Sequence, residues 1–161
     1  MSHSYSEGYA LTVARTDSGW SVRRFRDDFE DISTSIDAVR ALRSEGPAFA
    51  MLNVEDEYLL IVRPGPSSVR VLISDATMAV DDDFAADALE EAGFEIPDID
   101  LDQLDDTDAW ADGNFDILAD LGLPEQVMSI LLDSDPAPHD LALTIAEDLD
   151  FADEFLRAAK K

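Results

Sequence analysis

The side chains of this sequence that could do chemistry are almost all carboxylates. The chain holds 37 Asp and Glu, only two histidines (His3 and His139), and no cysteine. The lack of cysteine excludes disulfides, thiolate nucleophiles, iron–sulfur clusters and thiolate zinc sites. Carboxylates can still attract cations and basic proteins, or transfer protons where two of them share a dry cleft. We therefore expect no cofactor, no metal site and no catalytic residue.

The densest group of carboxylates lies between residues 95 and 113, where acids alternate with sparse apolar residues. A calcium loop beginning at Asp108 would put Trp110 at a ligand position and Ala119 at the place of the bidentate acid, so the EF-hand pattern fails. We predict an acidic tether whose aspartates contact a basic partner; a merely solvated linker is the alternative. The predicted contact residues are Asp98, Asp100, Asp102, Asp105, Asp106, Asp108 and Asp112.

Asp75 and Tyr58 are weaker candidates, as polar contacts of a ligand pocket. Asp75 directly follows an apolar run, and the ends of strands are places where sites are often built. The alternative is that Ser74 or Asp75 caps a short helix that starts at Ala76. No histidine is near Ser74 in the sequence, so a serine nucleophile is not supported.

The remaining polar candidates have plain structural interpretations. His139 follows Pro138 at the predicted start of a helix, where we expect an exposed and mostly neutral imidazole. Arg23, Arg24 and Arg26 form the only cationic cluster along the sequence. We interpret them as charges that protect an edge strand from unwanted pairing, in preference to an RNA contact.

The net charge of −26 is concentrated in the second half of the chain. Residues 1–70 hold eight arginines against 11 acids, a net charge of −3, whereas residues 71–161 hold three basic residues against 26 acids, a net charge of −23. Such a surface repels phosphate, so direct nucleic-acid binding through the C-terminal half is not expected, while a basic protein would be attracted. The alternatives are that the acids only provide solubility or adaptation to salt.

The elements that would position these residues indicate an α+β fold with an antiparallel five-stranded sheet and covering helices. Tyr9 to Val22 alternates around the turn residues 16–19, which predicts a hairpin. A capping-box pattern at Thr34 predicts a helix that ends at Gly46. Three apolar runs predict strands at 48–54, 58–62 and 69–73, buried enough to need a helix on at least one face. Asp81 to Asp83 begin a second helix that ends at Gly93.

The pattern divides the chain into an α+β sheet domain at 1–94, an acidic tether at 95–113 and a small all-helical unit at 114–161, which we expect to contain four helices. The longest apolar run of the chain is far shorter than the ~18 residues of a membrane span, so we expect no membrane partner. The first residues show no secretory signal pattern, so we expect a cytoplasmic protein.

The order of these pieces resembles a known family. Ala14 to Trp20 (ARTDSGW), Val71 to Ala76 (VLISDA), Asp116 to Leu123 (DILADLGL) and the stretch from Asp140 to Phe155 are similar to the actinobacterial tRNA adenosine deaminase-associated proteins. The resemblance spans most of the chain and implies association with a deaminase. It implies no catalytic residues, because the H-x-E and P-C-x-x-C motifs of zinc deaminases are missing from this sequence.

The leading hypothesis is a non-enzymatic accessory or regulatory protein that binds a basic protein through its acidic C-terminal half, with tRNA adenosine deaminase as the candidate partner. The alternative is a small-molecule or peptide binding module in which the sheet and its covering helix form a pocket wall beside Asp75 and Tyr58. An enzyme that uses carboxylates alone would require a cleft with two desolvated acids.

Overall fold

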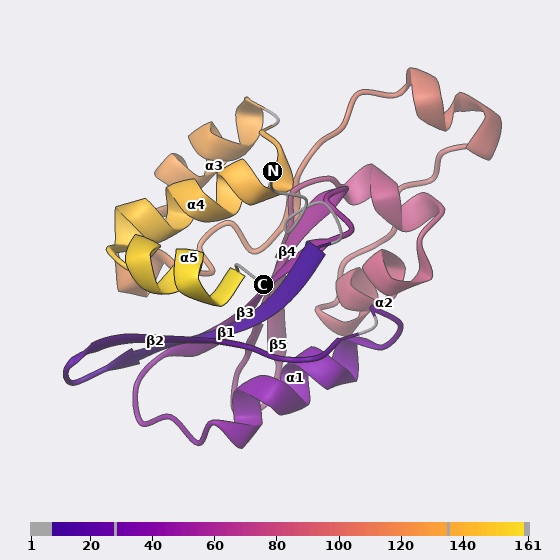
Figure 1. The fold of residues 1–161 in the computed structure, drawn as a ribbon. Coiled ribbons are helices and arrows are strands. Elements are labelled where there is room, and N and C mark those ends of the chain that lie inside the picture. The colour runs from indigo at the N-terminus through magenta and orange to yellow at the C-terminus, as the bar shows by residue number, and fades with distance from the viewer. Residues whose placement is uncertain (1–7, 28, 135, 160–161) are drawn as a thin grey trace.

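The computed structural model describes residues 8–27, 29–134 and 136–159. Its centre is one antiparallel sheet of six strands in the order β2-β1-β3-β4-β5-β6 (Figure 1). The strands are β1 (Gly8–Thr16), β2 (Gly19–Arg24), β3 (Ala48–Val54), β4 (Tyr58–Pro64), β5 (Val69–Ile73) and β6 (Asp112–Gly113). The predicted α+β class, hairpin and three-strand meander are confirmed. The predicted strand number of five is wrong by one.

The strand that the sequence pattern missed is β6, which lies inside the expected tether. Two residues are too few to show the alternation by which a strand is recognised. Asp112 and Gly113 pair with Ile73 and Leu72. The next residue, Asn114, donates its backbone N–H to the Val71 carbonyl (2.7 Å), and its side-chain oxygen accepts from the Val71 N–H (3.1 Å). This pairing holds the C-terminal end of the acidic segment on the sheet.

Helices cover both faces of the sheet (Figure 1). One face packs against α1 (Ile32–Ala41), η1 (Ala76–Val80) and α2 (Asp83–Glu91), and the other against α3 (Glu125–Asp133), α4 (Pro138–Leu149) and α5 (Ala152–Ala159). Successive side chains of a strand point to opposite faces, which is why the central strands are apolar almost throughout. Leu60 and Val62 of β4 belong to the first core, whereas Leu59 and Ile61 belong to the second.

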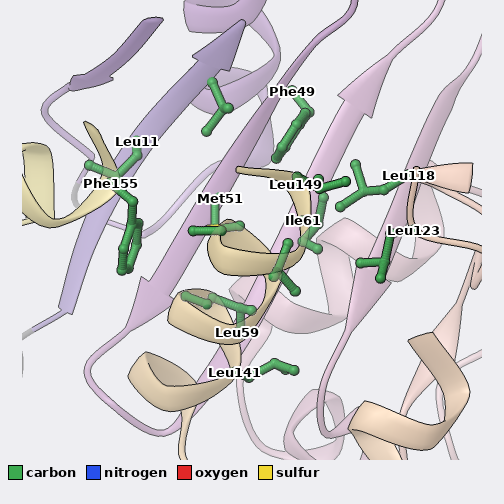
Figure 2. Close-up of a cluster of buried hydrophobic side chains, with 14 of the residues drawn as sticks. Leu11, Phe49, Met51, Leu59, Ile61, Leu118, Leu123, Leu141, Leu149 and Phe155 are labelled. Carbon is green, nitrogen blue, oxygen red and sulfur yellow. The ribbon is translucent and has the colours of Figure 1, made fainter. Parts of the chain in front are cut away.

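The second core joins the sheet to the C-terminal helices. Figure 2 shows Leu11, Met51 and Leu59 of the strands among side chains of the helical layer, including Leu141 and Phe155. The division of the chain at residues 94 and 113 stays a prediction. Any independent motion of residues 114–161 would have to open this shared apolar core.

The helices differ from the sequence expectation at both ends of α1 and in residues 114–121; α1 ends at Ala41 and not at the predicted Gly46. The first helix begins at Ile32, because the Asp31 carboxylate accepts from the Ser33 N–H (3.0 Å) and caps the helix three residues before Thr34. The stretch from Asn114 to Leu121, expected as a helix, forms turns and the short 3-10 helix η3 (Ala119–Leu121). The described part of residues 114–161 therefore holds three α-helices where four were expected. Among the described residues, none of the helices combines the length and apolar character that crossing a bilayer requires.

Candidate interaction site

Residues 95–111 leave the sheet and its helices as a long excursion, which returns to the sheet at β6 (Figure 1). Its one regular element is the 3-10 helix η2 (Leu101–Asp106). The exposed predicted contact residues are Asp98, Asp100, Asp102, Asp106 and Asp108. The side chain of Asp105 lies outside the described residues. Asp112 differs from the others, because it is half-buried in β6 and its carboxylate accepts from the Gly113 N–H (2.8 Å).

Two large apolar side chains are exposed among these carboxylates. Leu101 in η2 is 63% exposed and Trp110 is 42% exposed. The backbone of Trp110 is fixed, since its carbonyl accepts from the Ala76 N–H (2.7 Å) at the start of η1. We call the five exposed aspartates together with Leu101 and Trp110 the excursion surface.

A cleft of about 660 Å³ lies between the excursion and the body of the protein. Its acidic lining comes from the β3–β4 turn, from Asp75 and from the N-terminus of α2, while Leu104, Thr107 and Ala109 come from the excursion. No Lys or Arg is among the residues that line it. We call this the acidic cleft, and its carboxylates are Glu55, Glu57, Asp75, Asp81, Asp82 and Asp83.

Two of these acids cap the N-termini of helices. The Asp75 carboxylate accepts from the Thr77 N–H (3.0 Å) and caps η1, and Asp82 accepts from the Phe84 N–H (2.9 Å) and caps α2. The interpretation that Ser74 or Asp75 caps a helix starting at Ala76 is confirmed, with Asp75 as the cap. A capped carboxylate keeps free lone pairs, so capping does not prevent either side chain from contacting a ligand.

Tyr58 lies beneath the cleft and supports one of its acids. It is fully buried, and its hydroxyl donates to the Asp82 carboxylate (3.0 Å). Burial and the Asp82 charge raise the pKa of Tyr58 well above its usual value, so the phenol keeps its proton. Desolvation, and then the nearby Glu55 and Asp82, raise the pKa of Glu57. Negative charge is therefore crowded at this edge, which favours a cationic ligand.

Of the two predicted pocket residues, the structure places Asp75 in the lining of the acidic cleft, whereas Tyr58 is buried and reaches the cleft only through its hydrogen bond to Asp82. None of the tether aspartates whose side chains are described lines the cleft. The contributions of Glu55, Glu57, Asp81, Asp82 and Asp83 were missed. The predicted antiparallel meander could have indicated these acids, because in such a meander β3 and β5 end at the same edge of the sheet. Residues 55–57 and 74–83 must then be neighbours.

His139 does not have the exposed position expected from the sequence. It is half-buried, its Nδ1 lies 2.8 Å from the Tyr9 hydroxyl, and its ring stacks on Phe155. Burial lowers the pKa of His139, and the charges of Asp140 and Asp56 oppose that effect in part. The neutral state that we expected is thus the favoured one. Over the part of the chain that the structure describes, no group of three or more His, Asp or Glu is arranged to hold a metal ion.

These features define a three-layer α+β protein that carries a cluster of acids at one end of the sheet. The chain belongs to the family described as Rv3753c-like tRNA adenosine deaminase-associated protein, which matches residues 8–152. Protein Rv3753c of Mycobacterium tuberculosis (strain ATCC 25618 / H37Rv) is 37% identical over 150 residues, which cover 92% of this chain and 85% of that protein. The family resemblance seen in the sequence is therefore confirmed. No solved structure matches the chain.

Proposed function

We propose that this protein is a cytoplasmic, non-enzymatic accessory protein that binds a basic protein partner through the excursion surface and the rim of the acidic cleft. The observation that carries the proposal is the presence of Leu101 and Trp110, both exposed, within a run of exposed aspartates. Solubility alone accounts for exposed acids but not for a 42% exposed tryptophan among them.

Charge and apolar anchors have separate tasks in this proposal. The carboxylates attract a basic surface over a distance and speed the encounter at low salt. The anchors supply affinity, because buried aromatic side chains account for much of the binding energy at interfaces. Trp110 suits this role, since its backbone is already fixed on the sheet side by Ala76.

The proposed partner is a tRNA adenosine deaminase, and the family description is what supports this choice. A protein that acts on tRNA needs a basic surface to bind phosphates. The excursion surface has the opposite charge and could dock on that face. Binding of this protein and binding of tRNA would then compete.

The proposal is tested by affinity capture of the purified deaminase with variants of the tagged protein. The excursion variant replaces exposed aspartates by asparagine at Asp98, Asp100, Asp102, Asp106 and Asp108. A matched control removes the same amount of charge from exposed acids of residues 114–161, with Asn or Gln at Asp116, Asp133, Glu147, Asp148 and Asp150. We expect the excursion variant to lose capture and the control to retain it. Equal loss in both would mean that binding follows net charge and has no defined surface.

A third variant separates the anchors from the charges. Trp110→Ala combined with Leu101→Ala leaves all carboxylates in place, so we expect association to remain fast and dissociation to accelerate about tenfold or more. Surface plasmon resonance resolves the two rates. An unchanged dissociation rate would contradict the role of the anchors.

The acidic cleft favours a second candidate, a binding module for a cationic small molecule or peptide. Its volume of about 660 Å³ lies in the range of ligand sites, and Leu104 and Ala109 add apolar lining to the carboxylates. A ligand stabilises the folded state by mass action, so a thermal-shift screen of polyamines and Arg-rich peptides tests this candidate. Loss of the shift in Asp83→Asn would support it, and the absence of any shift would count against it.

A further inference from the structure

The end of the sheet opposite to the acidic cleft carries a second cleft, of about 350 Å³, whose described lining includes four arginines and no carboxylate. Arg40 and Arg43 come from the C-terminal end of α1 and the residues after it, and Arg63 and Arg70 come from β4 and β5. We call this the arginine cleft. Along the sequence only residues 23–26 stand out as a cationic cluster, because the four arginines here are brought together by the fold.

Most of the hydrogen-bonding capacity of these arginines is unused. Arg63 is satisfied, since it donates twice to the Asp120 carboxylate (2.6 and 2.8 Å) and once to the Ile117 carbonyl (2.7 Å). Arg40 donates to the Gly65 carbonyl at 3.3 Å. Throughout the described chain, the guanidinium groups of Arg43 and Arg70 make no hydrogen bond or ion pair. A guanidinium group carries five donors, so Arg40 and Arg43 on the α1 side could still bind an anion. The alternation along β4 and β5 directs Arg63 and Arg70 to the other face of the sheet, toward Asp120.

Internal electrostatics does not account for this concentration of positive charge. Arg63 and Arg70 stand directly opposite each other on neighbouring strands, an arrangement that destabilises a sheet when the charges are alike. The Asp120 carboxylate pairs with Arg63, and the hydrogen bond from Arg63 and the charge of Arg70 both lower its pKa, but one carboxylate offsets only one of the two charges. The C-terminus of α1 carries a partial charge of about −0.5, which Arg40 and Arg43 together exceed. The excess charge therefore points to a ligand.

We propose that the arginine cleft binds the phosphate or pyrophosphate group of a small molecule. The planar fork of arginine matches phosphate oxygens in pairs, and the two guanidinium groups of Arg40 and Arg43 suit a multivalent anion better than a single carboxylate. The volume is that of a small-ligand site.

The strongly acidic remainder of the molecule makes a long polyanion the less favoured occupant. The strand β4 runs from Tyr58, beneath the acidic cleft, to Pro64 in the lining of the arginine cleft. Its seven residues span about 20 Å at ~3.3 Å per residue. This exceeds the Debye length of ~8 Å at physiological salt. A compact phosphate in the cleft therefore interacts mainly with the arginines. An RNA strand that extends past the cleft would meet the acids as well.

Isothermal titration calorimetry with pyrophosphate and with a nucleoside diphosphate tests the proposal on the full-length protein at about 150 mM salt. We expect saturable binding with one site per chain. Arg40→Gln combined with Arg43→Gln should weaken it about 100-fold, which corresponds to about tenfold for each charge-assisted contact. Both side chains are exposed, so the fold should be retained. The matched control, Arg26→Gln with Arg157→Gln, removes equal charge elsewhere and should change the affinity by less than about twofold.

Amide chemical shifts locate the ligand without any substitution. Pyrophosphate should shift the Ser44, Gly46 and Gly65 signals, which belong to the lining. Absence of saturable binding, equal binding by the two double variants, or shifts confined to other residues would overturn the proposal. A single-stranded RNA that binds more tightly than pyrophosphate through the same arginines would overturn the small-molecule assignment and establish a polyanion site.

Discussion

At the level of single residues, a contact among three side chains joins the sheet to the helical layer. These side chains are Tyr9, His139 and Phe155. The Tyr9 hydroxyl lies 2.8 Å from His139 Nδ1, and both rings pack against Phe155. Because His139 is held partly out of water in this contact, the folded protein favours the neutral imidazole. The stability of the fold is thereby linked to pH.

The first prediction concerns the sign of that link. The pKa of His139 is lowered in the folded state from an ordinary value of 6.5, so the unfolded chain binds a proton more readily. The contribution of His139 to stability is complete above pH 6.5 and declines as pH falls through that value. Urea titration between about pH 5.5 and 7.5 measures the free energy of unfolding. As the pH is lowered over this range, we expect this free energy to fall more steeply in the wild type than in His139→Gln. Parallel curves for the two proteins would contradict this.

Local rules predicted the cap of η1, although they misplaced the cap of α1, and they did not predict which polar side chains are buried. The capping role of Asp75 could be derived from the residues next to it, since a cap acts within two or three positions along the chain. The burial of His139 could not be derived, because it depends on Tyr9, a residue 130 positions away. The same holds for Tyr58, whose partner Asp82 lies on a different element.

Among the elements, β6 has the greatest effect on the proposed site, because it fixes the point where the excursion rejoins the sheet. Gly113 makes this strand possible. Its φ of +119° disfavours any residue with a Cβ atom, and a Cβ at this position would lie 2.4 Å from the Val71 carbonyl oxygen. The excursion surface therefore depends on a glycine that has no side chain to contact a partner.

The second prediction is that Gly113→Ala detaches β6 and costs about 1–3 kcal/mol. Amide hydrogen exchange should show loss of protection at Val71 and Asn114, which pair with each other in the native fold. Gly93→Ala is the control, since Gly93 also has a positive φ (+87°) but a Cβ there would meet no atom within 4 Å. Its effect should be limited to backbone strain of about 1 kcal/mol. Equal exchange behaviour in the two variants would contradict the steric argument.

The regular elements of the sheet were predictable because their signals are long and strong. The runs that became β3 and β4 are apolar over most of their seven residues each, and the hairpin of β1 and β2 has turn chemistry between alternating segments. The two-residue strand β6 and the 3-10 turns of residues 114–121 carry no such signal. The acidic cleft is assembled from four separate segments, and its acids come from two of them, so its full set of acids needed the strand order first.

At the scale of the whole molecule, the shared core couples the C-terminal helices to the sheet. Phe151 of the helical layer has its ring centroid 4.9 Å from that of Trp20 in β2 and 6.4 Å from that of Phe49 in β3. Phe155 is fully buried against Tyr9 of β1. We expect the sheet and these helices to unfold together.

The third prediction tests that coupling. Phe155→Ala should destabilise the protein by about 3–5 kcal/mol, the usual cost of removing a buried aromatic ring. Amide exchange should accelerate in β1 and β3 as well as in α4 and α5. Leu156→Ala, at a position of the same helix that is 37% exposed, should have a much smaller effect. Unchanged protection of the strands in Phe155→Ala would show that residues 114–161 unfold as an independent unit.

Under the two proposals, the two ends of the sheet bind partners of opposite charge. Acids and exposed apolar anchors surround the end where β3 meets β4, and arginines line the end where β4 meets β5. Net charge and its concentration in residues 71–161 were visible in the sequence. The position of the arginine cleft was not, because its four members are spread over residues 40–70 and meet only in the folded chain.

Binding of the purified protein to tRNA adenosine deaminase at about 50 mM and about 300 mM salt tests the central claim most directly, because exposed-charge attraction fades over this range. We predict association that weakens markedly at the higher salt, and displacement of the bound protein by tRNA. Absence of binding at the lower salt, or a complex that tolerates excess tRNA without dissociating, would contradict an acidic surface that docks on the RNA-binding face.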